Sequence, residues 1–250
     1  MAEPVLSLRH LRKSFGGLVV TDDVTLDVMP DELHAVIGPN GAGKTTLINL
    51  VSGLLALDGG SIVFAGHNVT TLTPPARAAL GLARSFQITS IVPGFSALEN
   101  VALAVQARSG SSFRFFKPAA DEADLNAPAL AALLEVGLLE RADVPAAHLS
   151  HGEKRALELA VALAMEPKLL LLDEPMAGTG REEGDRIVAL LRQLKGRFPM
   201  VLVEHDMTAV FALADRISVL IYGRVIASGP PEVVRADPQV HAAYLGDEME

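Results

Sequence analysis

The run Gly38-Pro-Asn-Gly-Ala-Gly-Lys44-Thr45 is the feature that most constrains this sequence. It matches the pattern G-x-x-x-x-G-K-[ST] at every fixed position, between an apolar segment, Leu33–Ile37, and a segment that starts at Lys44 without helix breakers. Glycines let a backbone wrap closely around phosphate oxygens with its N–H groups pointing inward, and a helix start adds partial positive charge. The pattern therefore predicts a phosphate-binding loop between a buried strand and a helix.

The residues of this loop have distinct expected tasks. We expect the Lys44 ammonium to reach the β- and γ-phosphates of a nucleotide, and the Thr45 hydroxyl to supply an oxygen to Mg²⁺. The expected nucleotide contacts extend over the whole run: Gly38, Pro39, Asn40, Gly41, Ala42, Gly43, Lys44, Thr45 and Thr46.

A second run, Leu169-Leu-Leu-Leu-Asp173-Glu174-Pro175, places two carboxylates directly after an apolar segment. A buried strand of this kind delivers Asp173 to its carboxyl end, where α/β sheets bind ligands. We expect Asp173 to hold Mg²⁺ or its waters, and Glu174 to polarise an attacking water as general base. Acidic residues at strand ends are common, but in a chain with a phosphate-binding loop the pair indicates nucleotide hydrolysis.

Composition limits the classes of protein to which the chain can belong. It has 250 residues, half of them hydrophobic, with a formal net charge of −9 and no cysteine. Disulfides and cysteine metal sites are excluded, and nucleic acid is disfavoured as a partner because neutralising phosphates needs clustered Lys and Arg. The first residues lack the features of a signal peptide, and no window offers the ~20 apolar residues that span a bilayer. We expect a soluble chain whose membrane role comes through a partner.

Strands and helices alternate in the first and last thirds of the sequence. Apolar or alternating runs predict strands at 24–28, 33–37, 61–65, 169–172, 200–203, 217–221 and 225–227. Helices are expected from Lys44 towards Leu55, with Gly53 as the first breaker, and around Ile187–Leu194. The Ala- and Leu-rich middle, from about 96 to 165, predicts helices interrupted near 109–118 and 143–150. These patterns indicate an α/β protein with a largely parallel core and an inserted helical subdomain.

Four shorter features accompany these motifs in the order and spacing of a known family. They are Phe15, Gln87 in Ser85-Phe86-Gln87, the run Leu149-Ser150-His151-Gly152-Glu153 ahead of Asp173, and His205 in Val203-Glu204-His205-Asp206. Together with the two motifs they resemble the ATP-binding-cassette (ABC) ATPases over essentially the whole chain. In that family these positions hold the aromatic that stacks on adenine, the Q-loop glutamine, the LSGGQ signature and the switch histidine.

The resemblance implies both a fold and a site. The fold is a P-loop NTPase core with a mixed or parallel sheet, an N-terminal antiparallel β region and an inserted α-helical subdomain. It implies one ABC ATPase domain over 1–250, with the nucleotide-binding core at 1–87 and 166–250 and the helical subdomain at about 88–165. ATP and Mg²⁺ are the implied cofactors. Its implied residues are Glu174, His205 and Gln87 for catalysis, Thr45, Gln87 and Asp173 for the metal, and Phe15 for adenine.

The same resemblance implies that two cassettes pack head to tail with two ATP molecules between them. Signature residues would then contact the ATP that the partner chain's P-loop holds: Ser150, His151, Gly152 and Glu153. The helical subdomain would carry the docking surface for a transmembrane permease subunit, and Gln87 would join that subdomain to the core. The sequence leaves open whether the second cassette is identical or a related chain.

Two departures from the family pattern are visible. His151 and Glu153 replace Gly and Gln in the signature, and the segment 176–180 lacks the usual D-loop aspartate. The backbone N–H of Gly152 is unaffected by either change. We interpret His151 as a solvent-facing variant, while the missing aspartate leaves open how the two ATP sites communicate.

A narrower resemblance concerns the last third of the chain. Ala-Gly after Glu174-Pro175-Met, Val-Glu-His205-Asp-Met207 and the ending Asp237-Pro-Gln-Val-His-Ala-Ala-Tyr-Leu-Gly246 are similar to the ATP-binding subunits of branched-chain amino acid importers. We therefore expect an ATPase that drives solute uptake at the cytoplasmic face of the plasma membrane, indirectly serving a solute-binding protein. The alternatives are a urea or amide importer of the same subgroup, or a soluble ATP-switch protein, which Glu174 and His205 disfavour.

Overall fold

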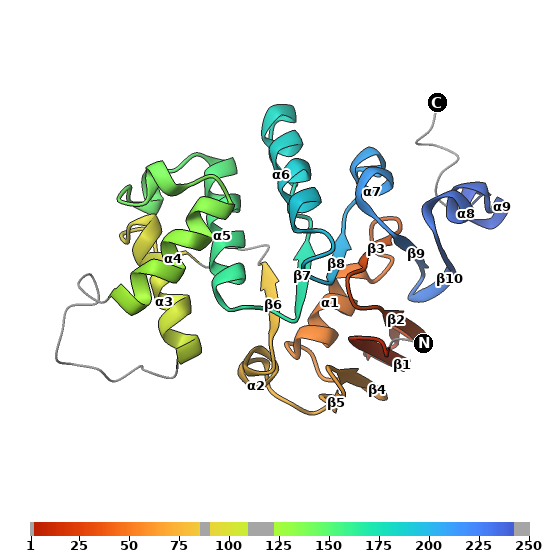
Figure 1. Cartoon of the computed structure of the whole chain (residues 1–250). Helices are drawn as coiled ribbons and strands as arrows, with labels where there is room; N and C mark the ends of the chain where they lie inside the picture. Colours follow the sequence, from red (N-terminus) through yellow and green to blue (C-terminus); the bar gives the residue numbers. More distant parts are fainter. Residues whose placement is uncertain (1–2, 86–90, 110–122, 243–250) are drawn as a thin grey trace. The chain divides into compact units, whose positions relative to one another are not determined.

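The computed structural model describes residues 3–85, 91–109 and 123–242 of the chain (Figure 1). They form two compact units, the first from Met1–Leu82, Lys168–Glu174 and Leu191–Glu250, the second from Ala83–Pro167 and Pro175–Leu190. The division into core and helical subdomain stays a prediction. The second unit also takes in Pro175–Leu190, which the sequence assigns to the core.

Two sheets are present among the described residues. An antiparallel sheet has the order β2-β1-β4-β5, and a larger one has the order β10-β9-β3-β8-β7-β6. In the larger sheet β3 is parallel to β8 and β9, β7 is parallel to β8, and β10 runs antiparallel to β9. This arrangement confirms the predicted fold class. The strands are β1 (Leu6–Phe15), β2 (Leu18–Val28), β3 (Leu33–Ile37), β4 (Gly59–Phe64), β5 (His67–Asn68), β6 (Leu82–Ser85), β7 (Leu169–Asp173), β8 (Met200–Val203), β9 (Arg216–Ile221) and β10 (Arg224–Gly229).

One apolar core joins both sheets of the first unit to the helix that follows the phosphate loop. That helix, α1, contributes Leu47, Ile48 and Val51 to a cluster with side chains from β1, β2, β3, β4, β7 and β8. Burying each such side chain stabilises the fold by about 1.5–3 kcal/mol. The helices outside the second unit's bundle are α1 (Lys44–Ser52), α2 (Pro74–Ala79), α6 (Arg181–Leu194), α7 (Met207–Leu213), α8 (Pro231–Ala236) and α9 (Pro238–Val240).

The C-terminal end of α1 is held by a buried arginine. The helix ends at Ser52, before the expected Leu55, because Gly53 takes a left-handed conformation with φ 81°. Arg77 of α2 is almost fully buried, and its Nη1 donates to the carbonyl oxygens of Leu50 at 2.7 Å and Val51 at 2.6 Å. A cation at this end offsets the negative end of the helix dipole. Arg77 therefore fixes the helix whose other end carries the phosphate loop.

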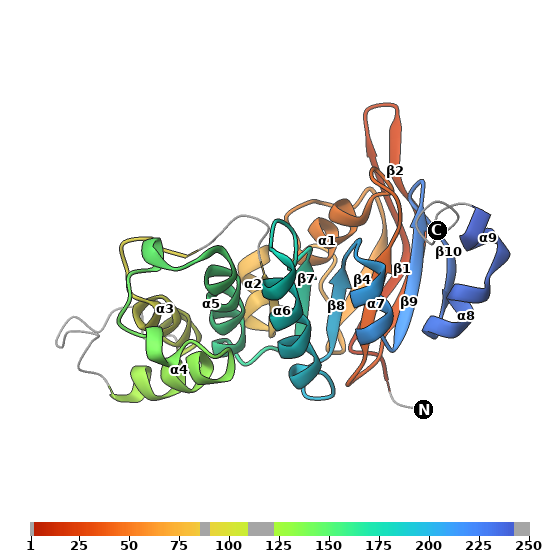
Figure 2. The same cartoon turned by 90° about the horizontal axis from the view of Figure 1, so that it is seen from above.

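The strand β1 is the longest of several elements that the sequence analysis leaves unassigned, and its register explains why. Leu6, Leu8 and Leu11 are buried, so the alternation of buried and exposed side chains shifts by one residue between Leu8 and Leu11. A bulge lies there, with His10 at φ 53°. β1 then continues into a hairpin with β2, in which Phe15 pairs with Leu18 (Figure 2).

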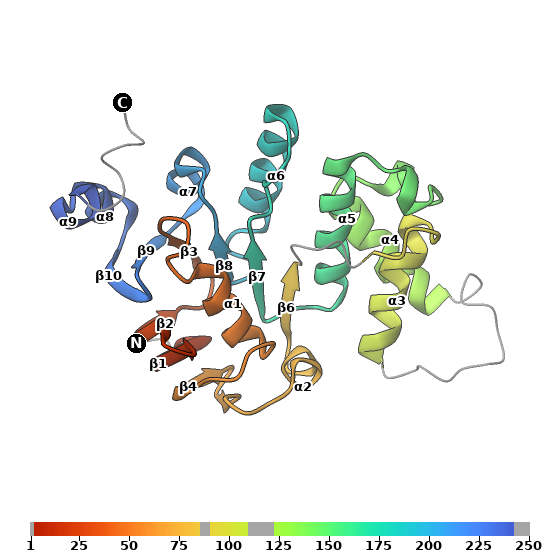
Figure 3. The same cartoon turned by 180° about the vertical axis from the view of Figure 1, so that it is seen from behind.

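The second unit is mainly helical, as predicted for the middle of the chain. Its helices α3 (Ala97–Ser109), α4 (Ala123–Glu135) and α5 (His151–Ala164) pack against one another (Figure 3). Short 3-10 turns follow α4 at Leu139–Arg141 and Ala146–His148, the second of them within the predicted interruption near 143–150. The other predicted interruption, near 109–118, lies almost wholly outside the described residues. No helix within the described ranges is long and apolar enough to cross a membrane.

Candidate active site

The phosphate-loop motif forms a tight turn between β3 and α1, and two of its glycines lie where no side chain fits. A Cβ on Gly38 would lie 2.0 Å from the carbonyl oxygen of Leu220 in β9, and one on Gly43 would lie 2.6 Å from that of Val20 in β2. Gly43 also has φ 102° and is the N-cap of α1. The backbone of the loop therefore packs directly against two strands.

Hydrogen bonds hold the loop from behind and leave its inner side open. The N–H of Gly223, in the turn after β9, donates to the carbonyl of Ala42 at 3.0 Å. At Gly41, by contrast, a Cβ would meet nothing within 4 Å. The loop surrounds a cavity of about 190 Å³ that is lined by Val20, Asn40, Gly41, Ala42, Gly43, Lys44, Thr45, Thr46 and Glu174. The sequence names all of these except Val20, which is brought in by the packing of β2 on the loop.

The electrostatics of this cavity favour an anion. Lys44 is buried, and its ammonium donates to the carbonyls of Gly38 and Pro39. The first turn of α1 contains no acidic residue, so the partial positive charge of the helix start is not offset within that turn. A cation and a helix start thus converge on one cavity in a chain whose formal net charge is −9.

Of the two carboxylates at the end of β7, the second lines this cavity and is held in a costly backbone conformation. All five residues of β7 are buried, and its last residue, Asp173, is 2% exposed. Glu174 has φ 49°, in the left-handed region that costs about 1 kcal/mol for a residue with a side chain. Its N–H donates to the carbonyl of Val203 in β8 at 2.8 Å. This bond keeps Glu174 among the residues that line the cavity.

His205 and Phe15 lie in the same unit but outside the lining of this cavity. Asp173 is paired with Val203, so the chain after β8 leaves the sheet at the same edge as Glu174. His205 follows there with its side chain 61% exposed, and its backbone N–H donates to the buried carboxylate of Glu204 at 3.0 Å. Phe15 is 49% exposed on the β1–β2 hairpin. Gln87, the remaining predicted catalytic residue, lies outside the described residues.

The signature residues form the start of α5 in the second unit. Ser150 is the N-cap, and a reciprocal capping box links it to Glu153: Ser150 Oγ accepts from the Glu153 N–H at 3.2 Å, and Glu153 Oε2 accepts from the Ser150 N–H at 2.8 Å. Arg141 Nε donates to Glu153 Oε1 at 2.9 Å. Glu153 therefore has a structural partner that the sequence analysis does not identify, and His151 beside it is exposed.

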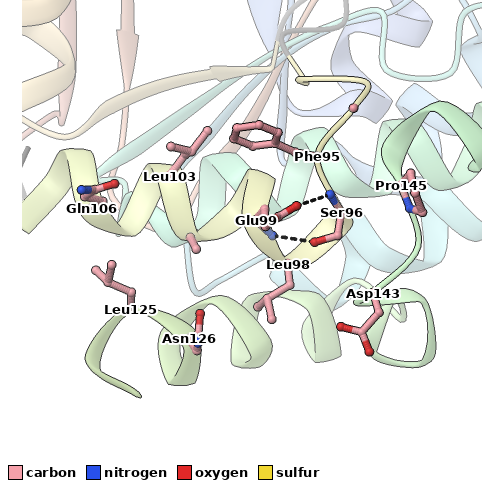
Figure 4. Close-up of a pocket in the computed structure, with 12 residues that line it drawn as sticks. Phe95, Ser96, Leu98, Glu99, Leu103, Gln106, Leu125, Asn126, Asp143 and Pro145 are labelled. Carbon is pink, nitrogen blue, oxygen red and sulfur yellow. Dashed lines mark hydrogen bonds between the residues drawn. The ribbon is translucent and has the colours of Figure 1, made fainter. Parts of the chain in front are cut away.

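A second hollow lies within the helical unit, between α3, α4 and the segment before α5. This groove has a volume of about 720 Å³, and Figure 4 shows apolar side chains such as Phe95, Leu98, Leu103 and Leu125 among polar ones in its lining. Another capping box begins α3, in which Ser96 N–H donates to Glu99 Oε2 at 2.7 Å and Glu99 N–H donates to Ser96 Oγ at 3.1 Å. The capping box thus holds the first turn of α3, whose residues line the groove.

Comparison with known sequences decides the family. The profile of the ABC transporter family matches residues 21–177, which is more than half of the chain and includes both the phosphate loop and Glu174. The chain belongs to the ABC transporter ATPases. It therefore binds nucleotide and hydrolyses ATP. A second profile, of the branched-chain amino acid ATP-binding cassette transporters, matches residues 224–250.

Full-length relatives and solved structures agree with this assignment of the cassette. The high-affinity branched-chain amino acid transport ATP-binding protein LivG of Escherichia coli K12 is 36% identical, over 99% of this chain and 100% of its own. BraF of Pseudomonas aeruginosa, with the same description, is also 36% identical over the same shares. The crystal structure of MJ1267, an ATP-binding cassette of an ABC transporter in its ADP conformation, is similar with a TM-score of 0.86 and 28% identity. The alignment covers 98% of this chain and 100% of the MJ1267 chain.

The capping box at the signature makes the stability of the second unit depend on pH. The Ser150 N–H, helped by Arg141 and opposed by burial, lowers the pKa of Glu153 below its ordinary value. A depressed folded-state pKa means that the ionised carboxylate stabilises the fold above the unfolded-state pKa, and that this is lost as pH falls through the folded-state pKa. We expect Glu153→Gln to lower the free energy of unfolding by about 0.5–1 kcal/mol at pH 7, and by less at pH 3.

Urea unfolding at the two pH values checks this expectation. Glu140→Gln is the matched control, because Glu140 is an exposed glutamate in the 3-10 turn that also contains Arg141. A difference between parent and Glu153→Gln that stays constant down to pH 3 would show that the ionised carboxylate adds nothing.

Proposed function

We propose that this cassette is the ATP-hydrolysing subunit of an importer of branched-chain amino acids or closely related solutes. The observation that carries the catalytic part is the cavity in which the phosphate loop, Thr45 and Glu174 meet. The solute is supported by LivG and BraF, both similar over their whole length, and by the C-terminal profile match. The LptB ATP-binding protein of a lipopolysaccharide export system in Haemophilus influenzae is 33% identical, so the cassette core alone does not decide the cargo.

The phosphate loop binds the triphosphate. Backbone N–H groups between Asn40 and Thr46 surround the β- and γ-phosphates, except that of Ala42, which donates to the carbonyl of Pro39. The ammonium of Lys44 turns from the loop carbonyls to the phosphate oxygens. Lys44 is already in place, because its ammonium now donates to two carbonyls of this same loop. Phe15, half exposed on its hairpin, stacks on the adenine ring.

The residues at the cavity also fit Mg²⁺. This ion takes hard oxygen ligands, uses one or two protein groups and keeps several waters. Thr45 is among the residues that line the cavity, and Asp173 directly precedes Glu174, which lines it too. The side-chain oxygens of Thr45 and Asp173 would hold the ion, which neutralises phosphate charge when bound; the resemblance adds Gln87 as a further ligand.

Glu174 is the general base of the reaction. Its carboxylate accepts a proton from the attacking water, whose oxygen forms a bond to the γ-phosphorus as the bond to the leaving ADP oxygen breaks. His205, at the same edge of the sheet, positions the water and the γ-phosphate. The place of Glu174 in the lining of the cavity supports this role.

Each ATP is shared by two cassettes. Ser150 and the N–H of Gly152 bind the γ-phosphate of an ATP molecule that the partner cassette's loop holds. A helix start with a serine N-cap is suited to this contact, because its first N–H groups attract anions. ATP thereby closes a head-to-tail dimer, and hydrolysis opens it. The dimer acts at the cytoplasmic face of the plasma membrane, where it is bound to permease subunits. A solute-binding protein delivers the solute to these subunits.

Replacing the general base tests the proposed function. We expect Glu174→Gln to keep its nucleotide affinity and to slow hydrolysis about 10²-fold or more, because the amide cannot accept the proton of water. With ATP and Mg²⁺ it should accumulate as a dimer in size-exclusion chromatography. Lys44→Ala is the matched control and should lose nucleotide affinity instead. A Glu174→Gln chain that hydrolyses ATP at the parental rate, or stays monomeric with saturating ATP, contradicts the proposal.

The permease subunit docks at the groove of the helical unit. Two features of the groove support this proposal: apolar side chains in its lining, and the 42% exposed side chain of Leu103 among them. Exposed apolar side chains around a hollow are typical of protein–protein contacts.

We expect Leu103→Asp to leave the ATPase rate of the cassette in solution within about twofold and to lower permease-coupled transport at least about tenfold, the loss typical of one buried contact residue. Transport into vesicles that hold the assembled importer measures the effect. Leu134→Asp is the control, since Leu134 of α4 is 63% exposed and does not line the groove. Equal transport by the two variants would place the permease contact elsewhere.

A further inference from the structure

A carboxylate from α6 accepts a hydrogen bond from a backbone N–H at the start of the signature helix, α5. The N–H of Gly152 donates to Glu183 Oε1 at 3.3 Å. A Cβ on Gly152 would lie 2.8 Å from Glu183 Cδ and 2.9 Å from that oxygen, so the carboxyl group packs directly on the glycine backbone. Both residues belong to the second unit, and Glu183 is only partly exposed.

The neighbouring donor of this helix turn is used differently. The N–H of Glu153 donates to the side chain of its own N-cap, Ser150, at 3.2 Å. Glu183, in contrast, comes from another helix, 31 residues further along the chain. It therefore brings a separate negative charge to the Gly152 N–H, the group assigned to the γ-phosphate of the partner's ATP.

Resting on the proposed function, we propose that Glu183 is an internal competitor for that γ-phosphate. Carboxylate and phosphate are attracted to a helix start by the same N–H groups and the same dipole, and they repel each other. In the separated cassette the carboxylate of Glu183 accepts a hydrogen bond from the N–H of Gly152, and it moves away when the partner's ATP binds. After hydrolysis and phosphate release its return favours the open state.

The displaced carboxylate has a second favourable position. Glu183 lies in the first turn of α6, together with Glu182, where negative charge is stabilised by the dipole of α6 itself. Rotation about its side-chain bonds takes the carboxylate away from Gly152 without a change in the backbone. The competitor is therefore displaced at low cost, which suits a contact that must open and close in every cycle.

ATP-driven dimerisation measures the competition. In a chain that already carries Glu174→Gln, we expect the further change Glu183→Gln to lower the ATP concentration for half-maximal dimerisation about threefold to tenfold, because a neutral amide competes less well than a carboxylate. Size-exclusion chromatography over an ATP titration with Mg²⁺ gives this concentration. The affinity of the monomer for nucleotide should be unchanged, since the phosphate loop belongs to the first unit.

Glu182→Gln, in the same background, is the matched control. It removes the same charge one residue earlier, from an exposed side chain, and should leave the dimerisation midpoint unchanged. Equal midpoints for the Glu183 variant and its Glu174→Gln parent overturn the inference while leaving the proposed function intact. A Glu174→Gln chain that never dimerises with ATP removes the proposed function, and the inference falls with it.

The contact itself is tested in the nucleotide-free monomer by NMR. An amide proton that donates to a carboxylate resonates downfield, so the Gly152 proton should move upfield in Glu183→Gln and stay in place in Glu182→Gln. An unmoved Gly152 resonance in a folded Glu183→Gln chain overturns the inference without reference to dimerisation.

Discussion

The close contact between the phosphate loop and the strands behind it is the constraint on which the rest of the structure depends. Backbone atoms of β9 and β2 leave no room for a side chain at Gly38 or Gly43, and Gly223 donates to the loop carbonyl of Ala42. The loop is thus supported from the side of the strands, and the cavity lies on its other side. Burial of α1 in the core and the cap that Arg77 places on its last carbonyls hold the helix start in position.

The proposed catalysis then depends on bringing an acid–base group to the cavity formed by the phosphate loop. The apolar β7 ends in Asp173, and the left-handed backbone of Glu174, anchored to Val203, adds a carboxylate to the same cavity. The signature belongs to the second unit and forms a capped helix start, which is the feature that suits it to a phosphate. There Arg141 partners the carboxylate of Glu153, and Glu183 contacts the backbone of Gly152. The second unit thus contains both the N–H proposed to bind the γ-phosphate and the carboxylate proposed to compete with that phosphate.

How much the sequence predicts depends on whether the determining contacts are local. The strands β3, β7 and β8 are mostly apolar runs whose residues are all buried, so their positions and the loop after β3 could be predicted. The bulge at His10 breaks the alternation of β1 and concealed that strand. Val20, Arg141 and Glu183 act through partners far along the chain, and no local pattern marks such contacts. Gln87 remains a prediction, since it lies outside the described residues.

The most direct test of a site shared between chains is the nucleotide affinity of a Ser150→Arg monomer. A bulky cation at the N-cap of α5 obstructs the γ-phosphate of the partner's ATP, whereas the chain's own phosphate loop belongs to the other unit. Titration with a fluorescent nucleotide should therefore give the parental dissociation constant, although hydrolysis and ATP-driven dimerisation are both lost. A dissociation constant raised as far as in Lys44→Ala would contradict the account, because the signature would then contribute to the site of its own chain.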